Sequence, residues 1–117
     1  MTREEFEDVV SEAMDELPDW VLEAIENVVV LVEQRPDPSQ DPDGEGLFGI
    51  YEGIPLPDRG FDYSLVLPDR IMIFQESLEH AFSDRDELKE EIRVTVLHEV
   101  AHHLGIDDER LEELGWE

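Results

Sequence analysis

The first part of the chain has the apolar spacing of an amphipathic helix. Between Phe6 and Leu17, apolar side chains recur at intervals of three and four residues, which places them on one stripe of a helix. Thr2 precedes Glu5 by three residues, the spacing of a capping box at a helix start. We therefore predict a helix from about Thr2 to about Leu17.

The pattern then changes several times between helical and extended. Pro18 ends the first helix, and residues 19–25 predict a second, short one. Residues 27–33, NVVVLVE, have the β-branched composition of a buried strand. Residues 47–57 and 70–74 predict two further strands.

Loops and helices occupy the rest of the chain. Residues 35–46 hold three prolines, two glycines and four acids and predict a loop. Residues 59–70 form a turn-rich connection, and residues 75–82 predict a short helix. Ser83 and Asp86 resemble an N-cap signal, and the helix after them is expected to run to about Leu104.

The long C-terminal helix is expected to carry two neighbouring stripes. One is apolar, and it comprises Val94, Leu97, Ala101 and Leu104. The other is mostly polar, and it comprises Glu91, Thr95, His98 and His102. Gly105 stands where a helix end favours a left-handed residue. Asp107 is a cap for a last short helix containing Leu111 and Leu114.

Composition narrows the class of protein. The 117 residues predict one domain over residues 1–117. The absence of cysteine excludes disulfides and thiolate metal sites. No basic segment precedes an apolar run, and the longest such run, Val28 to Val32, is too short to span a membrane. We expect a cytoplasmic protein.

The charge is strongly negative. Asp and Glu number 33 against eight Lys and Arg, which gives a net charge of −25. Such a field repels nucleic acid and anionic membranes and attracts cations and basic partners. We therefore expect neither nucleic acid nor a membrane as a partner.

Three of the four histidines fall within residues 98–103, in the stretch HEVAHHLGIDD. His98 and His102 are four residues apart, so both rings lie on one helix face and reach one metal ion. Glu99 is rotated off the ligand direction and can take a proton from a metal-bound water. The pattern His-Glu-x-x-His is typical of zinc hydrolases.

The residues after the second histidine extend the pattern to His-Glu-x-x-His-x-x-Gly-x-x-Asp. Gly105 allows a sharp turn out of the helix, and Asp108 can then supply an oxygen ligand. Two nitrogens and one oxygen leave a fourth position open, as catalysis requires. The alternatives for the third ligand are Asp107, Glu109, Glu112 and Glu113.

This motif resembles that of the zincin metallopeptidases whose third ligand is aspartate. It is similar to the metzincin motif, and most similar to the small bacterial mini-zincin family. The stretches LFGIYEGIPLPDR, LPDRIMIF and HEVAHHLGIDDERLEELGW carry the resemblance. The resemblance implies an α+β class with a minimal zincin-like fold, in which a small mixed sheet packs against the active-site helix and the N-terminal helices. It also implies one zinc per chain on His98, His102 and Asp108, with Glu99 as general base. Metzincins have a methionine beyond the third ligand, whereas the last methionine here is Met72.

Four nearby residues have weaker functional signals. His103 points about 100° away from His102 on a helix, which favours a packing role or a supporting contact over a ligand role. His80 is interpreted as structural. Tyr51 and Tyr63 are candidates for an oxyanion donor and equally for core residues.

Three functions remain open. The first is a zinc-dependent peptidase acting on peptides or unfolded protein segments, with an extended substrate added to a sheet edge built from LFGIY or RIMIF. The second is a zinc-binding domain that holds a basic partner and cleaves nothing. The third is a metal-dependent RNA endonuclease, which the negative charge and Glu99 disfavour.

Overall fold

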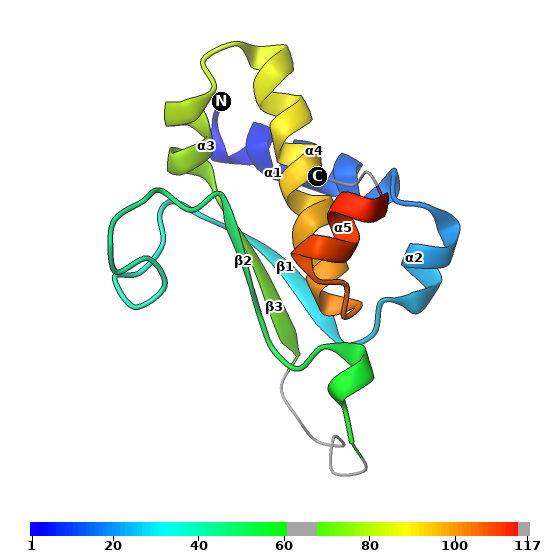
Figure 1. Ribbon diagram of the computed structural model, residues 1–117. Coiled ribbons are helices and arrows are strands. Elements are labelled where there is room, and N and C mark those ends of the chain that lie inside the picture. Colours follow the sequence, from blue (N-terminus) through cyan, green and yellow to red (C-terminus); the bar gives the residue numbers. More distant parts are fainter. Residues whose placement is uncertain (61–67, 115–117) are drawn as a thin grey trace.

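The computed structural model describes residues 1–60 and 68–114 and has the predicted α+β class. Helices and strands follow one another along the chain as shown in Figure 1. They are α1 (Arg3–Asp15), α2 (Asp19–Ala24), β1 (Val28–Glu33), β2 (Gly49–Glu52), the 3-10 helix η1 (Leu56–Asp58), β3 (Asp69–Phe74), α3 (Gln75–Ala81), α4 (Arg85–His103) and α5 (Asp108–Leu114). Most of the predicted connection over residues 59–70 lies outside the described residues.

The strands form the small mixed sheet that was predicted. Their order is β1-β3-β2, with β3 parallel to β1 and antiparallel to β2. The central position of β3 explains its continuous apolar sequence, because Ile71, Ile73 and Phe74 are fully buried. Within the described residues, β1 and β2 are the two edges. The expectation that RIMIF offers an edge is therefore wrong.

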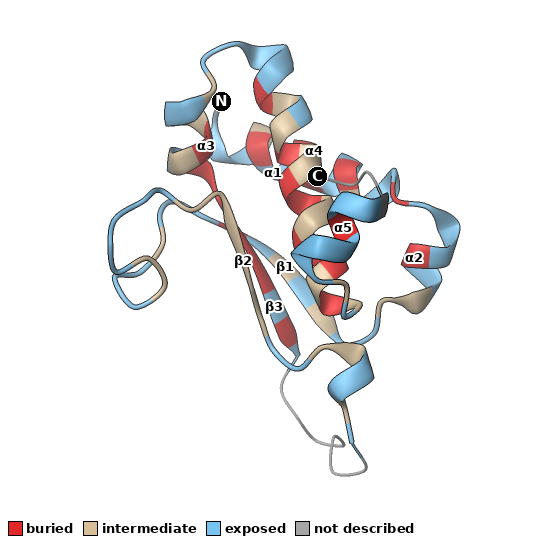
Figure 2. Ribbon diagram, viewed as in Figure 1, coloured by how far each residue is buried: buried red, intermediate tan, exposed pale blue. Residues whose placement is uncertain are grey.

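One face of the sheet carries the core. Helix α4 contacts α1, β2 and β3, and α1 also contacts β1 (Figure 1). The side chains that meet there include Phe6, Val9, Val10, Val21, Val32, Ile71, Ile73, Leu78, Ile92 and Val96. Figure 2 shows this burial on β3 and on one side of α4. The helix that carries the histidines is thus fixed to both the sheet and the N-terminal helix.

Two details of α4 differ from the prediction. Its N-cap is Asp84 rather than Ser83, because the Asp84 carboxylate accepts the Glu87 N–H at 2.9 Å. Its buried stripe includes Leu88, Ile92, Val96, Val100 and His103, whereas Val94 and Leu97 are only partly buried. Apolar residues occur on more than one side of this helix, so periodicity alone does not show which side is buried. Packing against α1 and β3 buries the side that carries Ile92 and Val96.

The end of α4 has the geometry that the glycine predicted. Gly105 has φ of 85°, in the left-handed region. Its N–H donates to the His102 carbonyl at 3.0 Å, and the Ile106 N–H donates to the Ala101 carbonyl at 2.9 Å. This pair of bonds is a Schellman motif. It turns the chain back so that α5 starts within three residues.

Two contacts hold the first turn of helix α5 in place. The Asp107 carboxylate accepts the Arg110 N–H at 2.9 Å, as expected of its cap. Leu111 is buried in the protein. These two contacts hold the first residue of α5, Asp108, beside the end of α4. Of the helices that the structure describes, none is long and apolar enough to cross a membrane.

Candidate metal centre

The structure brings His98, His102 and Asp108 to one point. The two imidazole rings project from successive turns of α4 with their centroids 4.6 Å apart. Asp108 Oδ1 lies 3.2 Å from His98 Nε2 and 3.1 Å from His102 Nε2. Three ligand atoms held tetrahedrally by one ion at about 2.0–2.1 Å would be about 3.3 Å apart. The donor types and their separations therefore fit a single small divalent metal.

Glu99 lies beside His102, near the ring nitrogen that faces away from Asp108. Its Oε2 lies 3.4 Å from His102 Nδ1, whereas Asp108 lies on the Nε2 side. Donor atoms of His98, Glu99 and His102 also lie within 4.8 Å of one another, so Glu99 is an alternative third ligand on distance alone. Among the acids that the structure describes, Asp108 is the one that contacts the Nε2 atoms of both rings. Asp108 therefore lies on the Nε2 side, where a metal would bind, whereas Glu99 lies on the Nδ1 side of His102.

The centre is open to solvent on one side. The side chains of His98, His102 and Asp108 are 34%, 29% and 78% exposed, whereas that of Glu99 is 8% exposed. Glu99 is buried because Gly49 of β2 approaches α4 there. A Cβ at Gly49 would lie 2.9 Å from Thr95 Cγ2 and 3.3 Å from Glu99 Cγ. A large molecule can reach the two imidazole rings, whereas the Glu99 carboxylate is shielded from bulk solvent.

The acids beside His102 change its protonation. The hydrogen bond to Glu99 raises the pKa of His102, and Asp108 raises it further, against the opposing effect of partial burial. In turn, the hydrogen bond from His102 lowers the pKa of the Asp108 carboxyl, and the charge of His98 acts in the same direction. A proton on His102 competes with a metal for the same nitrogen, so metal binding at this centre releases protons.

The other predicted candidates lie elsewhere. Asp107 is engaged as the cap of α5, and Glu113 pairs with Arg110 at 2.7 Å. Glu109 and Glu112 are exposed on α5, and His80 is exposed on α3. Tyr63 lies outside the described residues.

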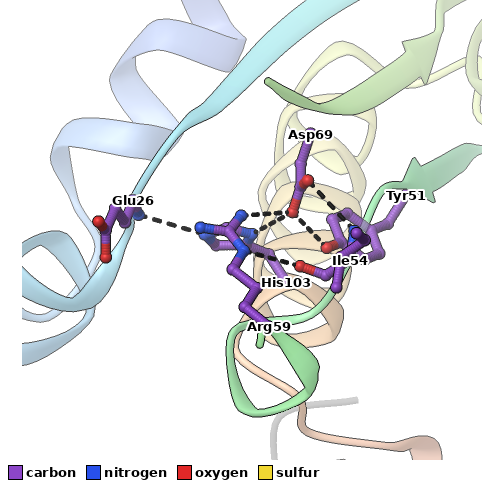
Figure 3. Close-up of polar contacts among 6 residues, drawn as sticks. All are labelled: Glu26, Tyr51, Ile54, Arg59, Asp69 and His103. Carbon is purple, nitrogen blue, oxygen red and sulfur yellow. Dashed lines mark hydrogen bonds and ion pairs between the residues drawn. The ribbon is translucent and has the colours of Figure 1, made fainter. Parts of the chain in front are cut away.

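His103 is buried in a polar network at the back of the centre (Figure 3). Its Nε2 accepts the backbone N–H of Glu26 at 3.2 Å. Its Nδ1 therefore carries the proton and donates to Asp69 Oδ2 at 3.0 Å. Burial lowers the pKa of His103, against the raising effect of Asp69, which keeps the ring neutral. Both nitrogens are thus occupied by the protein itself.

Asp69 is the centre of this network. Its Oδ2 accepts the Tyr51 hydroxyl at 2.5 Å and Arg59 Nη2 at 2.8 Å, and its Oδ1 accepts the Ile54 N–H at 3.2 Å. Burial raises the pKa of the Asp69 carboxyl, but these hydrogen bonds outweigh it and hold the pKa below its usual range. The carboxylate stays ionised in a buried position.

The network joins four other parts of the fold to His103 at the end of α4. They are Glu26 just before β1, Tyr51 in β2, the segment from Ile54 to Arg59, and Asp69 at the start of β3. The sequence patterns did not identify Asp69 or Arg59, although Asp69 is an acid that directly precedes the predicted strand at residues 70–74. The Tyr51 hydroxyl donates to Asp69, which argues against the oxyanion role considered for it.

Hollows lie on both sides of the histidine pair. One of about 270 Å³ reaches His98 and Glu99 from Phe48 and Glu91. Another of about 260 Å³ reaches His102 from Tyr51. Two larger hollows of about 450 and 460 Å³ lie between α1 and β1 and beside α3, away from both histidines. The two hollows that adjoin His98 and His102 lie one after the other along β2, beside the candidate metal centre.

Comparison with known proteins supports the assignment to a family. A solved structure of a conserved hypothetical protein from Thermo thermophilus has a similar fold, with a TM-score of 0.58 and 27% sequence identity over 97% of each chain. A comparison with curated proteins finds no match. The sequence model of the family described as zincin-like metallopeptidase matches residues 25–116, a range that contains the candidate metal centre. The chain therefore belongs to the zincin-like metallopeptidase family.

Proposed function

We propose that the protein is a zinc-dependent peptidase, with one zinc per chain held by His98, His102 and Asp108. The observation that carries the proposal is the contact of Asp108 Oδ1 with Nε2 of both histidines. Two imidazole nitrogens and one carboxylate oxygen are ligands that zinc takes in catalytic sites, where a fourth position stays open. Family membership supports the same metal.

The chemistry assigns one role to each side chain. Zinc at this centre would supply a water whose pKa is lowered to about 7 and would polarise the substrate carbonyl. Glu99 accepts a proton from that water as its oxygen bonds to the carbonyl carbon. Glu99 then delivers the proton to the amide nitrogen as the C–N bond breaks. The acid and the amine are the products.

The surroundings favour a peptide as substrate. The histidines are open to solvent. Sites for drug-sized ligands typically have volumes of about 300–1,000 Å³, and each of the two flanking hollows is smaller than that. Together they follow β2, whose only strand partner in the described residues is β3. An extended peptide can pair with the free edge of β2 and pass across both hollows.

Metal content tests the ligand set. Protein purified without chelator is expected to bind about one zinc per chain, and His98→Ala is expected to abolish it because two protein ligands are too few. Elemental analysis of both proteins gives the comparison. Full zinc content in His98→Ala would exclude this centre.

Turnover tests the role of Glu99. The variant Glu99→Gln keeps the size of the side chain and its hydrogen bonds but cannot accept a proton. We expect it to retain zinc and to lose about 10²–10⁴-fold in the rate of peptide cleavage. Glu109→Gln is the matched control, because Glu109 is an exposed acid near the centre. Equal cleavage rates in the wild type and Glu99→Gln would refute the proposed base.

A second candidate, a zinc-binding domain that holds a basic partner without cleaving it, is favoured by the net charge of −25. It predicts that zinc-loaded wild type cleaves no member of a broad peptide library while still binding basic peptides. The library assay, run with and without a chelator, separates the two candidates.

A further inference from the structure

The hollow beside His98 has walls of mixed character. It has a volume of about 270 Å³ and lies between β2 with its preceding residue and the middle of α4. Its lining residues are Phe48, Gly49, Glu91, Val94, Thr95, His98 and Glu99. The close approach of β2 at Gly49 makes the floor, since a Cβ there would meet Thr95 and Glu99. The hollow is therefore continuous with the two groups that serve the proposed reaction.

An acid stands at the end of this hollow away from the metal centre. Glu91 precedes His98 by seven residues, which is two helical turns or about 10 Å along α4. Both residues lie on the same side of the helix. Between them, Phe48 and Val94 offer apolar surface. A side chain that enters from His98 meets carbon first and a carboxylate last.

The Glu91 carboxylate is available to a ligand. The neighbouring Glu90 points to solvent and pairs with Arg93 at 3.5 Å. Within residues 1–60 and 68–114, no Lys or Arg forms an ion pair with Glu91. The Thr95 hydroxyl donates at 2.8 Å to the Glu91 backbone carbonyl and not to the carboxylate. Within the described residues, the Glu91 carboxylate thus forms no ion pair with a Lys or Arg of the protein.

We infer that this hollow receives a substrate side chain next to the bond that is cleaved, and that Glu91 makes Lys or Arg the preferred residue there. This inference rests on the proposed peptidase function and adds its specificity. Lys and Arg match the walls because they lay an apolar stem on apolar surface and carry a charge at the tip. Arg can also stack on the ring of Phe48.

The size of the preference follows from exposure. Glu91 is partly exposed, so its ion pair with a substrate contributes about 1 kcal/mol, the upper end of the range for pairs in contact with solvent. A factor of ten corresponds to about 1.4 kcal/mol. The expected preference for Lys or Arg over Met is therefore about fivefold in kcat/KM.

The experiment uses the zinc-loaded full chain and fluorogenic peptides of Ala and Gly with Lys, Arg, Met or Glu at each position in turn. We expect the wild type to prefer Lys and Arg about fivefold at one position beside the cleaved bond. Glu91→Gln should bring the ratio of Lys to Met near one, and Glu91→Lys should shift the preference to Glu. Glu90→Gln removes the same unit of net charge and should keep the wild-type ratio.

The outcomes separate this inference from the proposed function. Cleavage without a basic preference, or an unchanged preference in Glu91→Gln, overturns the inference and leaves the peptidase intact. Binding of the labelled peptides to zinc-loaded Glu99→Gln, followed by anisotropy, tests the hollow without turnover. A basic preference in binding that Glu91→Gln removes supports the hollow even if the wild type cleaves nothing. Equal binding of Lys and Met peptides overturns it.

Discussion

Removing the carboxylate of Asp69 should destabilise the whole fold. Asp69 is 2% exposed and pairs at 2.8 Å with Arg59, which is 7% exposed. Without the carboxylate, the buried Arg59 guanidinium loses its ion pair with Asp69, and the buried donors that Asp69 accepts lose this acceptor. Breaking a buried ion pair from one side costs about 3–5 kcal/mol. A small domain has a total stability of about 5–15 kcal/mol, so Asp69→Ala should be close to unfolding.

A second pair in the same sheet provides the control. Arg70 and Glu52 are also 2.8 Å apart, but their side chains are 54% and 36% exposed. An exposed pair of this kind contributes about 0.2–1 kcal/mol. The variant Glu52→Ala therefore removes an ion pair of equal length at a much smaller cost. The comparison keeps the ion-pair distance constant and changes burial together with the further hydrogen bonds that Asp69 accepts.

The assay is urea unfolding followed by far-ultraviolet circular dichroism. Asp69→Ala should lower the free energy of unfolding by about 3–5 kcal/mol, and Glu52→Ala by less than about 1 kcal/mol. The double variant Asp69→Ala/Arg59→Met should regain part of the loss, because it also removes the buried guanidinium that paired with Asp69. A cost below about 1 kcal/mol for Asp69→Ala, or no recovery in the double variant, would refute the reasoning.

Three further predictions concern the metal centre and its support. Asp108→Ala should lower zinc affinity, measured by competition with a chelator. Loss of a residue that hydrogen-bonds a metal ligand typically costs about 10–100-fold in affinity, and loss of the ligand itself should cost more. Glu109→Ala should leave the affinity unchanged. Gly105→Ala should lower the free energy of unfolding by more than about 1 kcal/mol, because a φ of 85° strains any other residue; equal urea midpoints would contradict this. The pKa of Asp69 is lower in the folded protein than the about 3.9 of an unfolded Asp, so its ionised form stabilises the fold above that value. The stability difference between wild type and Asp69→Asn should be complete at neutral pH and shrink as pH falls below about 4.

The sequence alone predicted the features that depend on neighbours along the chain. The i, i+4 spacing of His98 and His102 puts both rings on one face of any helix that contains them. Gly105 predicted the left-handed helix end because few other residues adopt that conformation without strain. Asp107 was recognised as a cap from its place before the last helix. The succession of helices and strands followed from similar local patterns, whereas the α+β class followed from the family resemblance.

Tertiary structure decided everything that depends on distant parts of the chain. The buried stripe of α4 was misjudged because contacts with α1 and β3 choose among several apolar sides. Periodicity also could not show which strand is central, and so the edge at RIMIF was wrong.

The roles of the two adjacent histidines illustrate the same division. Their one-residue offset predicted that they point in different directions. It could not predict that His103 meets Asp69, which lies 34 positions earlier, or that Asp69 gathers Tyr51 and Arg59 around it. A buried charge is stable only where the fold brings donors to it from several elements. No local pattern contains that information, so the support of the centre became visible only once the chain was folded.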